Sequence, residues 1–375
     1  MKKHYNIPIF IPHLGCPYNC IFCDQKRISG QIKPLLPSEL NNYIKKQLSY
    51  IPTEAKNIEI AFFGGNFTGI DHALQSQYLQ TAQKFIDGVR IIGLRVSTRP
   101  DAVNTEILQC LRNYRVHTIE LGVQSLVNEV LQASARYYTV DEVAQACRQI
   151  KKAGFALGLQ LMPGLPEDNW ENIRLTTRRA VAIKPDFIRI YPTLVIADTA
   201  LARDYAAGEY IPLSLEQAVA ITKEMWLEFS AHDIAVIRLG LYAEDMTGNG
   251  SVIAGPYHPA FGELVRQSIF MEQVDWGIEG YDHIPLKPVL DIWCHPRDMS
   301  AVIGQHRGNI NYWIEKWGFA QVKLHPDPNI VRGDVVLGTD KGMSPRYYLI
   351  FRPVFLQQRQ PWQITTPARG RWRDT

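Results

Sequence analysis

The sequence predicts an α/β protein: a partial (β/α)6 TIM-like barrel followed by a small C-terminal α+β domain. The chain has 375 residues, 46% hydrophobic and 21% charged, which suits one large globular domain and a smaller one. Over its first half, six short apolar runs alternate with helical patterns. Several of these runs also carry polar side chains on one face, as strands around a ligand-holding lumen would.

The predicted strands are short runs rich in apolar and β-branched residues, at 6–11, 58–63, 91–97, 118–122, 156–162 and 187–191. Helical patterns separate them. One begins at the capping box Thr139–Glu142 and ends at Gly154. Repeated βα units predict a parallel sheet flanked by helices. Six such units are compatible with a partial barrel or with an open doubly wound sheet.

The polar residues on the strands favour the barrel. Alternation places on one face Arg95, Ser97 and Arg99 of the third strand, Glu120, Gly122 and Gln124 of the fourth, Gln160 and Met162 of the fifth, and Arg189 and Tyr191 of the sixth. One explanation is an internal network, such as Glu120 paired with Arg189. A polar lumen that holds a charged cofactor explains the whole set better, because buried polar groups need partners.

Charge and hydropathy limit the classes of partner. The net charge of +3 permits an anionic partner such as RNA without requiring one. No apolar run reaches the roughly 18 residues that span a bilayer. The apolar piece at 7–12 is too short for a secretory signal and contains two prolines. We therefore expect a cytoplasmic protein that does not enter a membrane.

Three of the six cysteines, Cys16, Cys20 and Cys23, lie in the loop after the first predicted strand. Zinc prefers four ligands, so His13, Cys294 or His295 would have to complete its site. A redox pair would use two cysteines and leave Cys16 unexplained. In an iron–sulfur cluster, three thiolates would leave one iron open for a chelating ligand.

The C-x3-C-x2-C spacing, with the aromatic Phe22 before the last cysteine, resembles the cluster motif of the radical S-adenosylmethionine (SAM) superfamily. The resemblance implies a [4Fe–4S] cluster on Cys16, Cys20 and Cys23, with SAM chelating the fourth iron. It also implies reductive cleavage of SAM to a 5′-deoxyadenosyl radical, and an electron donor such as ferredoxin or flavodoxin. The cofactors would carry the difficult chemistry, and the protein would position them and exclude water.

Other loops resemble further motifs of this superfamily. The glycines of "FFGGNFTG" would approach the methionine ammonium, although Asn66 replaces the usual acidic residue. Arg136 is similar to the arginine that oxygen-independent coproporphyrinogen oxidases use on the methionine carboxylate. The cofactor-binding residues implied are Phe22, Gly64, Gly65, Asn66, Gln124, Arg136, Met162 and Pro163. The alternative for those outside the cysteine motif is a structural role, as turn glycines, a surface arginine or core glutamines.

From about residue 7 to 230 the chain resembles the radical domain of the Elongator catalytic subunit, which acts on the wobble uridine of transfer RNA. The resemblance rests on "STRPD", "IELGVQS", "MPGLPED" and "IRIYPTLVIADTALARDYAAGEY". The cysteines are spaced more closely than in the Elongator enzyme, and no acetyl-CoA signature follows the barrel. Acetyl-CoA chemistry is therefore doubtful.

The remainder of the chain is less regular. We expect a radical SAM barrel over 1–235, barrel-closing loops over 236–286, a small α+β domain over 287–352 and a basic tail over 353–375. "VIGQHRGNI" resembles the Gly-x-x-Gly loop of KH RNA-binding domains, but three residues instead of two separate its glycines. The candidate RNA-binding residues are Gly304, His306, Arg307 and Gly308. The alternative is a glycine-capped helix break.

The sequence thus predicts a radical SAM enzyme that modifies RNA, with transfer RNA as the expected substrate. The candidate catalytic residues are Glu120, Arg99, Gln160 and Arg189, any of which could instead steady the cofactor. Three alternatives remain open. The substrate could be a small molecule, as in coproporphyrinogen-type enzymes. The protein could be a non-catalytic RNA-binding protein with a cluster, or a zinc-binding module.

Overall fold

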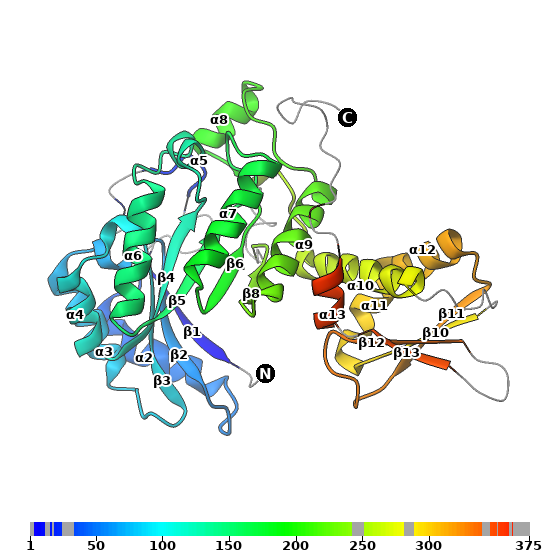
Figure 1. The fold of residues 1–375 in the computed structure, drawn as a ribbon. Coiled ribbons are helices and arrows are strands. Elements are labelled where there is room, and N and C mark those ends of the chain that lie inside the picture. Colours follow the sequence, from blue (N-terminus) through cyan, green and yellow to red (C-terminus); the bar gives the residue numbers. More distant parts are fainter. Residues whose placement is uncertain are drawn as a thin grey trace. The chain divides into compact units, whose positions relative to one another are not determined.

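The computed structural model describes residues 4–11, 16, 19–24, 34–241, 251–280, 289–339, 346–350, 352–359 and 362. Its contacts divide the chain into two compact units (Figure 1). The barrel unit comprises the described residues up to Ser214 together with those of Ile234–Tyr257. The C-terminal unit comprises Leu215–Asp233 and the described residues from His258 onward.

The barrel unit is built on one parallel sheet of seven strands (Figure 1). In spatial order these are β1 (Tyr5–Phe10), β2 (Ile58–Phe63), β3 (Ile91–Thr98), β4 (Val116–Gln124), β5 (Ala156–Leu161), β6 (Phe187–Ile190) and β8 (Ala235–Leu239). Each strand is parallel to its neighbours. The predicted partial barrel and its six strands are confirmed. The seventh strand was missed because most of its residues are partly or fully exposed, so it lacks a buried apolar run.

Helices follow the strands as βα units require. They are α2 (Pro37–Ser49), α3 (His72–Gln83), α4 (Thr105–Asn113), α5 (Asn128–Ala133), α6 (Val140–Lys152), α7 (Trp170–Ile183) and α8 (Ala200–Ala206). The predicted capping box is present at α6, where Thr139 and Glu142 exchange backbone-to-side-chain hydrogen bonds. A short antiparallel pair, β7 (Val195–Ile196) with β9 (Val252–Ala254), lies outside the main sheet.

The strands alternate between an apolar and a polar face. Ile60, Leu94, Ile119, Leu159 and Ile188 occupy the apolar face, and all are fully buried. Their sequence neighbours on the opposite face include Glu59, Arg95, Glu120, Gln160 and Arg189. The face of the sheet that lines the barrel lumen is therefore polar, as the sequence predicted.

Glu59 is the most completely bonded of these interior charges. Its carboxylate accepts hydrogen bonds from Arg95 Nη2 at 2.6 Å and from Thr118 Oγ1 at 2.6 Å, and His4 Nε2 lies 3.0 Å away. Burial alone would raise the pKa of Glu59. Hydrogen bonds from His117 and His4 and the charge of Arg95 outweigh burial and hold the pKa well below its usual range.

We expect Glu59→Gln to lower the free energy of unfolding at pH 7 by roughly 3 kcal/mol, because it removes the carboxylate that bonds the buried Arg95 and leaves only Glu120, 3.6 Å away, as its counter-charge. The pKa of Glu59 is lower in the folded than in the unfolded state. Its stabilisation is therefore complete above an unfolded-state value of about 4.3 and is lost as the pH falls toward the folded-state pKa.

Urea unfolding at pH 7, 5 and 3.5, followed by circular dichroism, tests this expectation. The wild type should lose stability with acid more steeply than Glu59→Gln. Glu54→Gln, at an exposed carboxylate, serves as the matched control and should follow the wild type. Equal pH slopes for wild type and Glu59→Gln would contradict the prediction.

The C-terminal unit is an α+β fold. Its sheet has the order β11 (Gln321–Pro326), β10 (Val289–Cys294), β12 (Val335–Thr339) and β13 (Arg346–Ile350). Strands β10 and β11 are parallel, and the other pairs are antiparallel. The helices are α9 (Leu215–Ala231), α10 (Phe261–Gly280), α11 (Met299–Ile303), α12 (Gly308–Trp317) and α13 (Arg352–Gln358). The fully buried Trp313 lies in the core that helices and sheet share.

Two of the expected boundaries differ from the structure. Residues 236–286 were expected to be loops, but they contain β8, β9 and the 20-residue helix α10. Gly and Pro residues before Phe261 indicated loops, and α10 buries residues on several sides, including Gln273 and Asp275, so its helical periodicity is weak. In addition, α9 groups with the C-terminal unit and not with the barrel.

The expected basic tail at 353–375 also begins differently. Its first residues belong to α13, in which Phe355 is fully buried. Arg359 is paired inside the unit, with Glu224 Oε1 and Glu272 Oε1 each at 2.7 Å. Arg359 therefore forms internal ion pairs and does not belong to a solvated tail. Arg369, Arg371, Trp372 and Arg373 lie outside the described residues.

No helix in the described ranges is both long enough and apolar enough to cross a bilayer.

Candidate functional site

The described part of the cysteine loop, residues 16 and 19–24, is anchored beside the strand ends. The Ile21 carbonyl accepts a hydrogen bond from the N–H of Leu201 at 2.8 Å, and the N–H of Ile21 donates to the Ser134 carbonyl at 3.4 Å. Cys20 and Phe22 are buried in a cluster with Val127, Val130, Met162, Leu165, Tyr191, Val195, Leu201, Ala202 and Tyr210. Many of these residues follow β4, β5 and β6, so the loop lies at the carboxyl edge of the sheet, where α/β folds bind ligands.

All three cysteines of this loop are free thiols. Burial, together with the neighbouring Cys20 and Cys16, raises the pKa of Cys23 to about 12. Burial and Cys20 also raise the pKa of Cys16, against the opposing charges of Arg99 and Arg136. Three thiolates in such a place need positive charge beside them, and the irons of a bound cluster would supply it. The donor set therefore fits an iron–sulfur cluster.

Within the described ranges, no group of three or more His, Cys, Asp or Glu side chains is arranged to hold a metal ion. A four-iron cluster does not need such a group, because its cysteine ligands bind different irons.

Arg136 connects the cysteine loop to the end of β4. Its Nη1 donates to Cys20 Sγ at 3.2 Å, its Nε donates to Tyr138 Oη at 2.7 Å, and its Nη2 donates to the Gly122 carbonyl. The Tyr138 hydroxyl donates to the same carbonyl at 2.9 Å. Sequence reasoning missed Tyr138, although it lies only two residues after Arg136.

Arg99 approaches the same cysteine from the end of β3. Its Nη1 lies 3.6 Å from Cys20 Sγ, and its Nε and Nη2 donate to the two carboxylate oxygens of Asp101 at 2.8 and 2.9 Å. The guanidinium carbons of Arg99 and Arg136 lie 5.4 and 5.0 Å from the centre of the Tyr138 ring. Cys20 thus has two cationic neighbours, held by Asp101 and Tyr138.

Gly64 and Gly65 follow β2 with φ angles of 126° and 96°. A Cβ atom on Gly64 would lie 2.4 Å from the Ile11 carbonyl oxygen, so only glycine fits beside the end of β1. Asn66 is buried, and its Oδ1 accepts a hydrogen bond from Thr98 Oγ1 at 2.8 Å. The structure thereby joins the glycine motif to the end of β3.

The remaining predicted cofactor residues lie together at the ends of β4 and β5. Gln160 Nε2 donates to Gln124 Oε1 at 3.2 Å, and the N–H of Met162 donates to the Gln124 carbonyl at 2.8 Å. The Pro163 carbonyl accepts from the N–H of Thr193 at 3.0 Å. Gln124 has a φ of 68°, an uncommon conformation for a residue other than glycine.

A buried aspartate braces the loop after β5, and sequence reasoning missed it. Asp168 accepts hydrogen bonds from the N–H groups of Gly164 at 3.0 Å and Asn169 at 3.1 Å. Tyr210 Oη donates to the Gly164 carbonyl at 2.6 Å. Burial raises the pKa of Asp168 to about 7. The signal was present in "MPGLPED", where the acid directly precedes the helix cap Asn169.

The charged side chains in the lumen lie close to one another, but several of their atoms make no hydrogen bond. Glu120 Oε2 lies 3.2 Å from Arg189 Nε and 3.6 Å from Arg95 Nη1. The internal pair considered from the sequence is therefore present. However, those three atoms and Ser97 Oγ are buried without a hydrogen-bond partner among the described residues. Each such atom costs about 1–3 kcal/mol unless a ligand or water satisfies it.

The candidate RNA-binding residues belong to the C-terminal unit. They occupy the turn between α11 and α12, where His306 and Arg307 are exposed and have φ angles of 51° and 62°. Gln267 supports this turn from α10, because its Oε1 accepts from the N–H of Gln305 at 2.8 Å. Gly304 has a φ of 75°, whereas Gly308 is helical.

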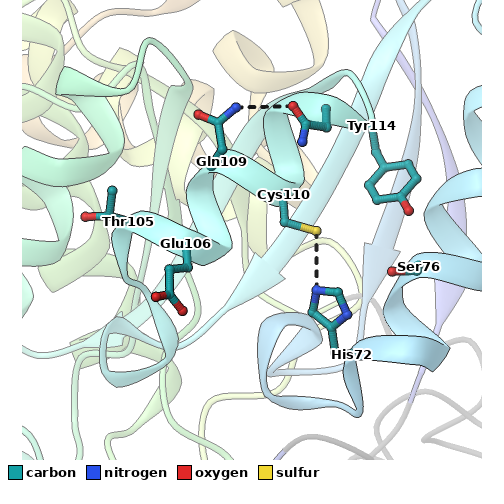
Figure 2. A pocket seen from close by; sticks show the side chains of 8 residues that line it. His72, Ser76, Thr105, Glu106, Gln109, Cys110 and Tyr114 are labelled. Atoms are coloured by element: carbon teal, nitrogen blue, oxygen red, sulfur yellow. Dashed lines mark hydrogen bonds between the residues drawn. The ribbon is translucent and has the colours of Figure 1, made fainter.

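A pocket lies on the helices that follow β2 and β3, and Figure 2 shows the side chains that line it. Its volume is about 630 Å³. It is lined by residues of α3 and α4, including His72 and Cys110, whose Nε2 and Sγ atoms lie 3.8 Å apart. Burial raises the pKa of Cys110, so this thiol stays protonated at neutral pH. None of the predicted site residues lines this pocket.

Comparison with known families agrees with the geometry at the cysteine loop. Residues 10–180 match the radical SAM superfamily, and residues 185–270 match the radical SAM C-terminal domain. The protein belongs to the radical SAM superfamily. This radical SAM protein is therefore an enzyme, and the predicted [4Fe–4S] cluster and SAM are confirmed as the cofactors of its family.

Two curated relatives share the barrel region of this radical SAM protein. The tRNA uridine(34) acetyltransferase of Methanocaldococcus jannaschii is 28% identical over 196 residues, which are 47% of this chain and 36% of that protein. The Elongator complex protein 3 of Homo sapiens is 26% identical over 185 residues, which are 44% of this chain and 34% of that protein. The chain thus spans about a third of the length of these two relatives. The predicted resemblance to the Elongator radical domain is confirmed.

One solved structure shows the same fold. The archaeal Methanocaldococcus infernus Elp3 with an N-terminal deletion superimposes with a TM-score of 0.57 at 21% identity. The match covers 72% of this radical SAM protein and 63% of that chain.

We expect the two charges nearest Cys20 to shift the reduction potential of a bound cluster in opposite directions. Reduction adds negative charge, which the Arg99 guanidinium stabilises and the Asp101 carboxylate opposes. Arg99→Gln should make the midpoint potential more negative, and Asp101→Asn should make it less negative.

Redox titration of the reconstituted protein, followed by electron paramagnetic resonance, measures both shifts. Arg112→Gln, at an exposed arginine on α4, is the control and should leave the potential unchanged. Iron content confirms that each variant is fully loaded. Identical potentials for the wild type and both variants would show that these residues do not act on the cluster.

Proposed function

We propose that this protein cleaves SAM reductively at its cysteine loop and uses the resulting radical chemistry to modify RNA, with transfer RNA as the substrate class. The observation that carries the proposal is the set of three free cysteines with two arginines at Cys20, at the carboxyl edge of a radical SAM barrel. Ferredoxin or flavodoxin is the proposed class of electron donor.

Cys16, Cys20 and Cys23 would hold the iron–sulfur cluster, and Phe22 would line its site among the buried apolar residues of the loop. When bound, the cluster and SAM supply a one-electron cleavage that yields a 5′-deoxyadenosyl radical. Arg99 and Arg136 would place positive charge beside Cys20 and orient the loop. The apolar side chains around Phe22 would exclude water from the reacting atoms.

The cofactor and the substrate would meet in the polar lumen. We assign the ends of β2, β4 and β5 to SAM, through Gly64, Gly65, Asn66, Gln124, Met162 and Pro163. Arg136 joins this set as the candidate that would bind the methionine carboxylate, because its guanidinium group already contacts Cys20. Gln160 bonds to Gln124 and would connect the two sites.

We assign Glu120 and Arg189 to the substrate, and Arg99 stays a candidate catalytic residue beside Cys20. The buried atoms of Glu120 and Arg189 that lack hydrogen-bond partners support this assignment. A substrate with both donors and acceptors, such as a nucleobase, could satisfy both side chains.

Two observations support RNA as the substrate. The curated relatives include proteins named tRNA uridine(34) acetyltransferase, and they match the barrel region. The C-terminal unit also places Arg307 and His306 on an exposed turn before α12, where a phosphate could meet backbone N–H groups. Acetyl transfer is not part of the proposal, because the match covers only about a third of those relatives.

We expect the anaerobically reconstituted, dithionite-reduced protein to form 5′-deoxyadenosine from SAM, and total transfer RNA to increase the rate. Cys23→Ala should reduce product to background, because it removes one thiolate of the cluster. The nucleoside is quantified by liquid chromatography with mass spectrometry.

Cys110→Ala is the matched control, since Cys110 lies on α4 outside the cysteine loop, and should retain iron and activity. Product that is indifferent to RNA would overturn the substrate class and point to a small molecule. No product from fully loaded protein would overturn the catalytic proposal and leave a cluster-bearing binding protein.

A further inference from the structure

Arg136 and Tyr138 lie in the short connection between α5 and α6, whose backbone is fixed at both ends. At its start, Ala135 has a φ of 53°, and the N–H of Arg136 donates to the Leu131 carbonyl at 2.9 Å, as at a helix that ends in a Schellman motif. At its end, Thr139 begins the capping box of α6. The two helix ends therefore set where both side chains begin.

Three hydrogen bonds form a closed network at one side of the Arg136 guanidinium. Its Nε donates to Tyr138 Oη at 2.7 Å, and its Nη2 donates to the Gly122 carbonyl. The Tyr138 hydroxyl donates to that same carbonyl at 2.9 Å and lies 3.2 Å from the Val123 carbonyl oxygen. The hydroxyl thus both accepts and donates, as a phenol can. Nη1, at the other side of the guanidinium, lies 3.2 Å from Cys20 Sγ.

Tyr138 is suited to hold the guanidinium because it is buried and stays neutral. It is only 3% exposed. Burial raises its pKa, against the opposing charges of Arg136 and Arg99, so the hydroxyl keeps its proton at neutral pH. The centre of its ring also lies 5.4 Å from the guanidinium carbon of Arg99 and 5.0 Å from that of Arg136, which favours both cations.

The closed network decides which part of Arg136 a ligand can use. A carboxylate binds arginine most strongly when two parallel N–H groups meet its two oxygens. A guanidinium offers such a pair at two edges, one that includes Nε and one formed by both Nη atoms. Tyr138 occupies Nε, so the edge with both Nη atoms remains for a carboxylate. Each Nη carries two N–H groups, so Nη2 can serve Gly122 and a ligand together.

We propose that Tyr138 is a positioning residue for cofactor binding, which holds Arg136 so that its edge beside Cys20 meets the carboxylate of SAM. The inference rests on the proposed function, because that function assigns SAM to this site. Tyr138 acts through Arg136 and does not touch the cofactor. Its effect on binding should therefore need both the arginine and the carboxylate, and should vanish when either is removed.

Equilibrium dialysis of the full chain, anaerobically reconstituted and oxidised, measures binding without turnover. The probes are SAM and decarboxylated SAM, which keeps the sulfonium and the ammonium and lacks only the carboxylate. Tyr138→Phe should weaken SAM binding about tenfold, because the guanidinium loses a hydrogen bond that fixes its orientation. The affinity for decarboxylated SAM should be the same in Tyr138→Phe and in the wild type.

Tyr78→Phe is the matched control. Tyr78 lies on α3 and is also buried, and its hydroxyl donates to a backbone carbonyl, that of Leu35, at 2.5 Å. This variant should bind both probes like the wild type. Iron content and circular dichroism show that each variant is loaded and folded. Equal SAM affinity in Tyr138→Phe and the wild type would overturn the proposal, and so would an equal loss for both probes.

A double-mutant cycle tests whether Tyr138 acts through Arg136. Arg136→Gln should itself weaken SAM binding, because glutamine offers no charged pair of N–H groups. Adding Tyr138→Phe to Arg136→Gln should then cause no further loss. A second tenfold loss in the double variant would show that Tyr138 acts independently of the arginine, and would overturn the positioning role.

The positioning role and the proposed function fail in different ways. If the variants bind as expected but the reduced wild type forms no 5′-deoxyadenosine, the catalytic proposal is overturned and the positioning role stands. If the wild type forms the nucleoside and Tyr138→Phe binds SAM equally well, only the positioning role is overturned. A fully loaded wild type that binds no SAM would overturn both.

Discussion

Compensation of buried charge inside the barrel is the constraint on which the rest of the structure depends. Near the start of β2, Glu59 is bonded by Arg95 and Thr118 and has all the partners that it needs. Further along the strands, Glu120 and Arg189 are paired but lack hydrogen-bond geometry. The buried atoms without hydrogen-bond partners thus gather around the Glu120–Arg189 pair. A fold can keep unsatisfied polar atoms only where other interactions stabilise it, and the hydrogen bonds to Glu59 are such interactions.

The cysteine loop also needs compensation of charge, here of the negative charge on its thiolates. Buried thiols resist ionisation, and three thiolates would repel one another, so the loop can bind its cofactor only beside positive charge. The irons of a bound cluster would supply that charge, and Arg99 and Arg136, which are both fixed by other contacts, add to it. Fixed donors need little rearrangement when a charged group binds, which is the condition for a preorganised site.

The sequence predicted those features of the fold and site that depend on local patterns of residues. The cysteine spacing indicated the superfamily, and strand alternation indicated the polar lumen, because both patterns are confined to short segments. Helix α10 was missed because burial on several sides removes the helical period. The contact of Arg136 with Tyr138 and Cys20 could not be predicted, since it joins residues from separate elements whose register only the fold determines.

The division into two units is consistent with chemistry on a nucleobase. A base that reacts inside a barrel must leave its stack, which costs a few kcal/mol. Under the proposed function, Glu120 and Arg189 would repay part of that cost through their buried atoms that lack hydrogen-bond partners. A second contact would hold the nucleotides that flank the reacting base, and the exposed His306 and Arg307 of the C-terminal unit are the candidates for it.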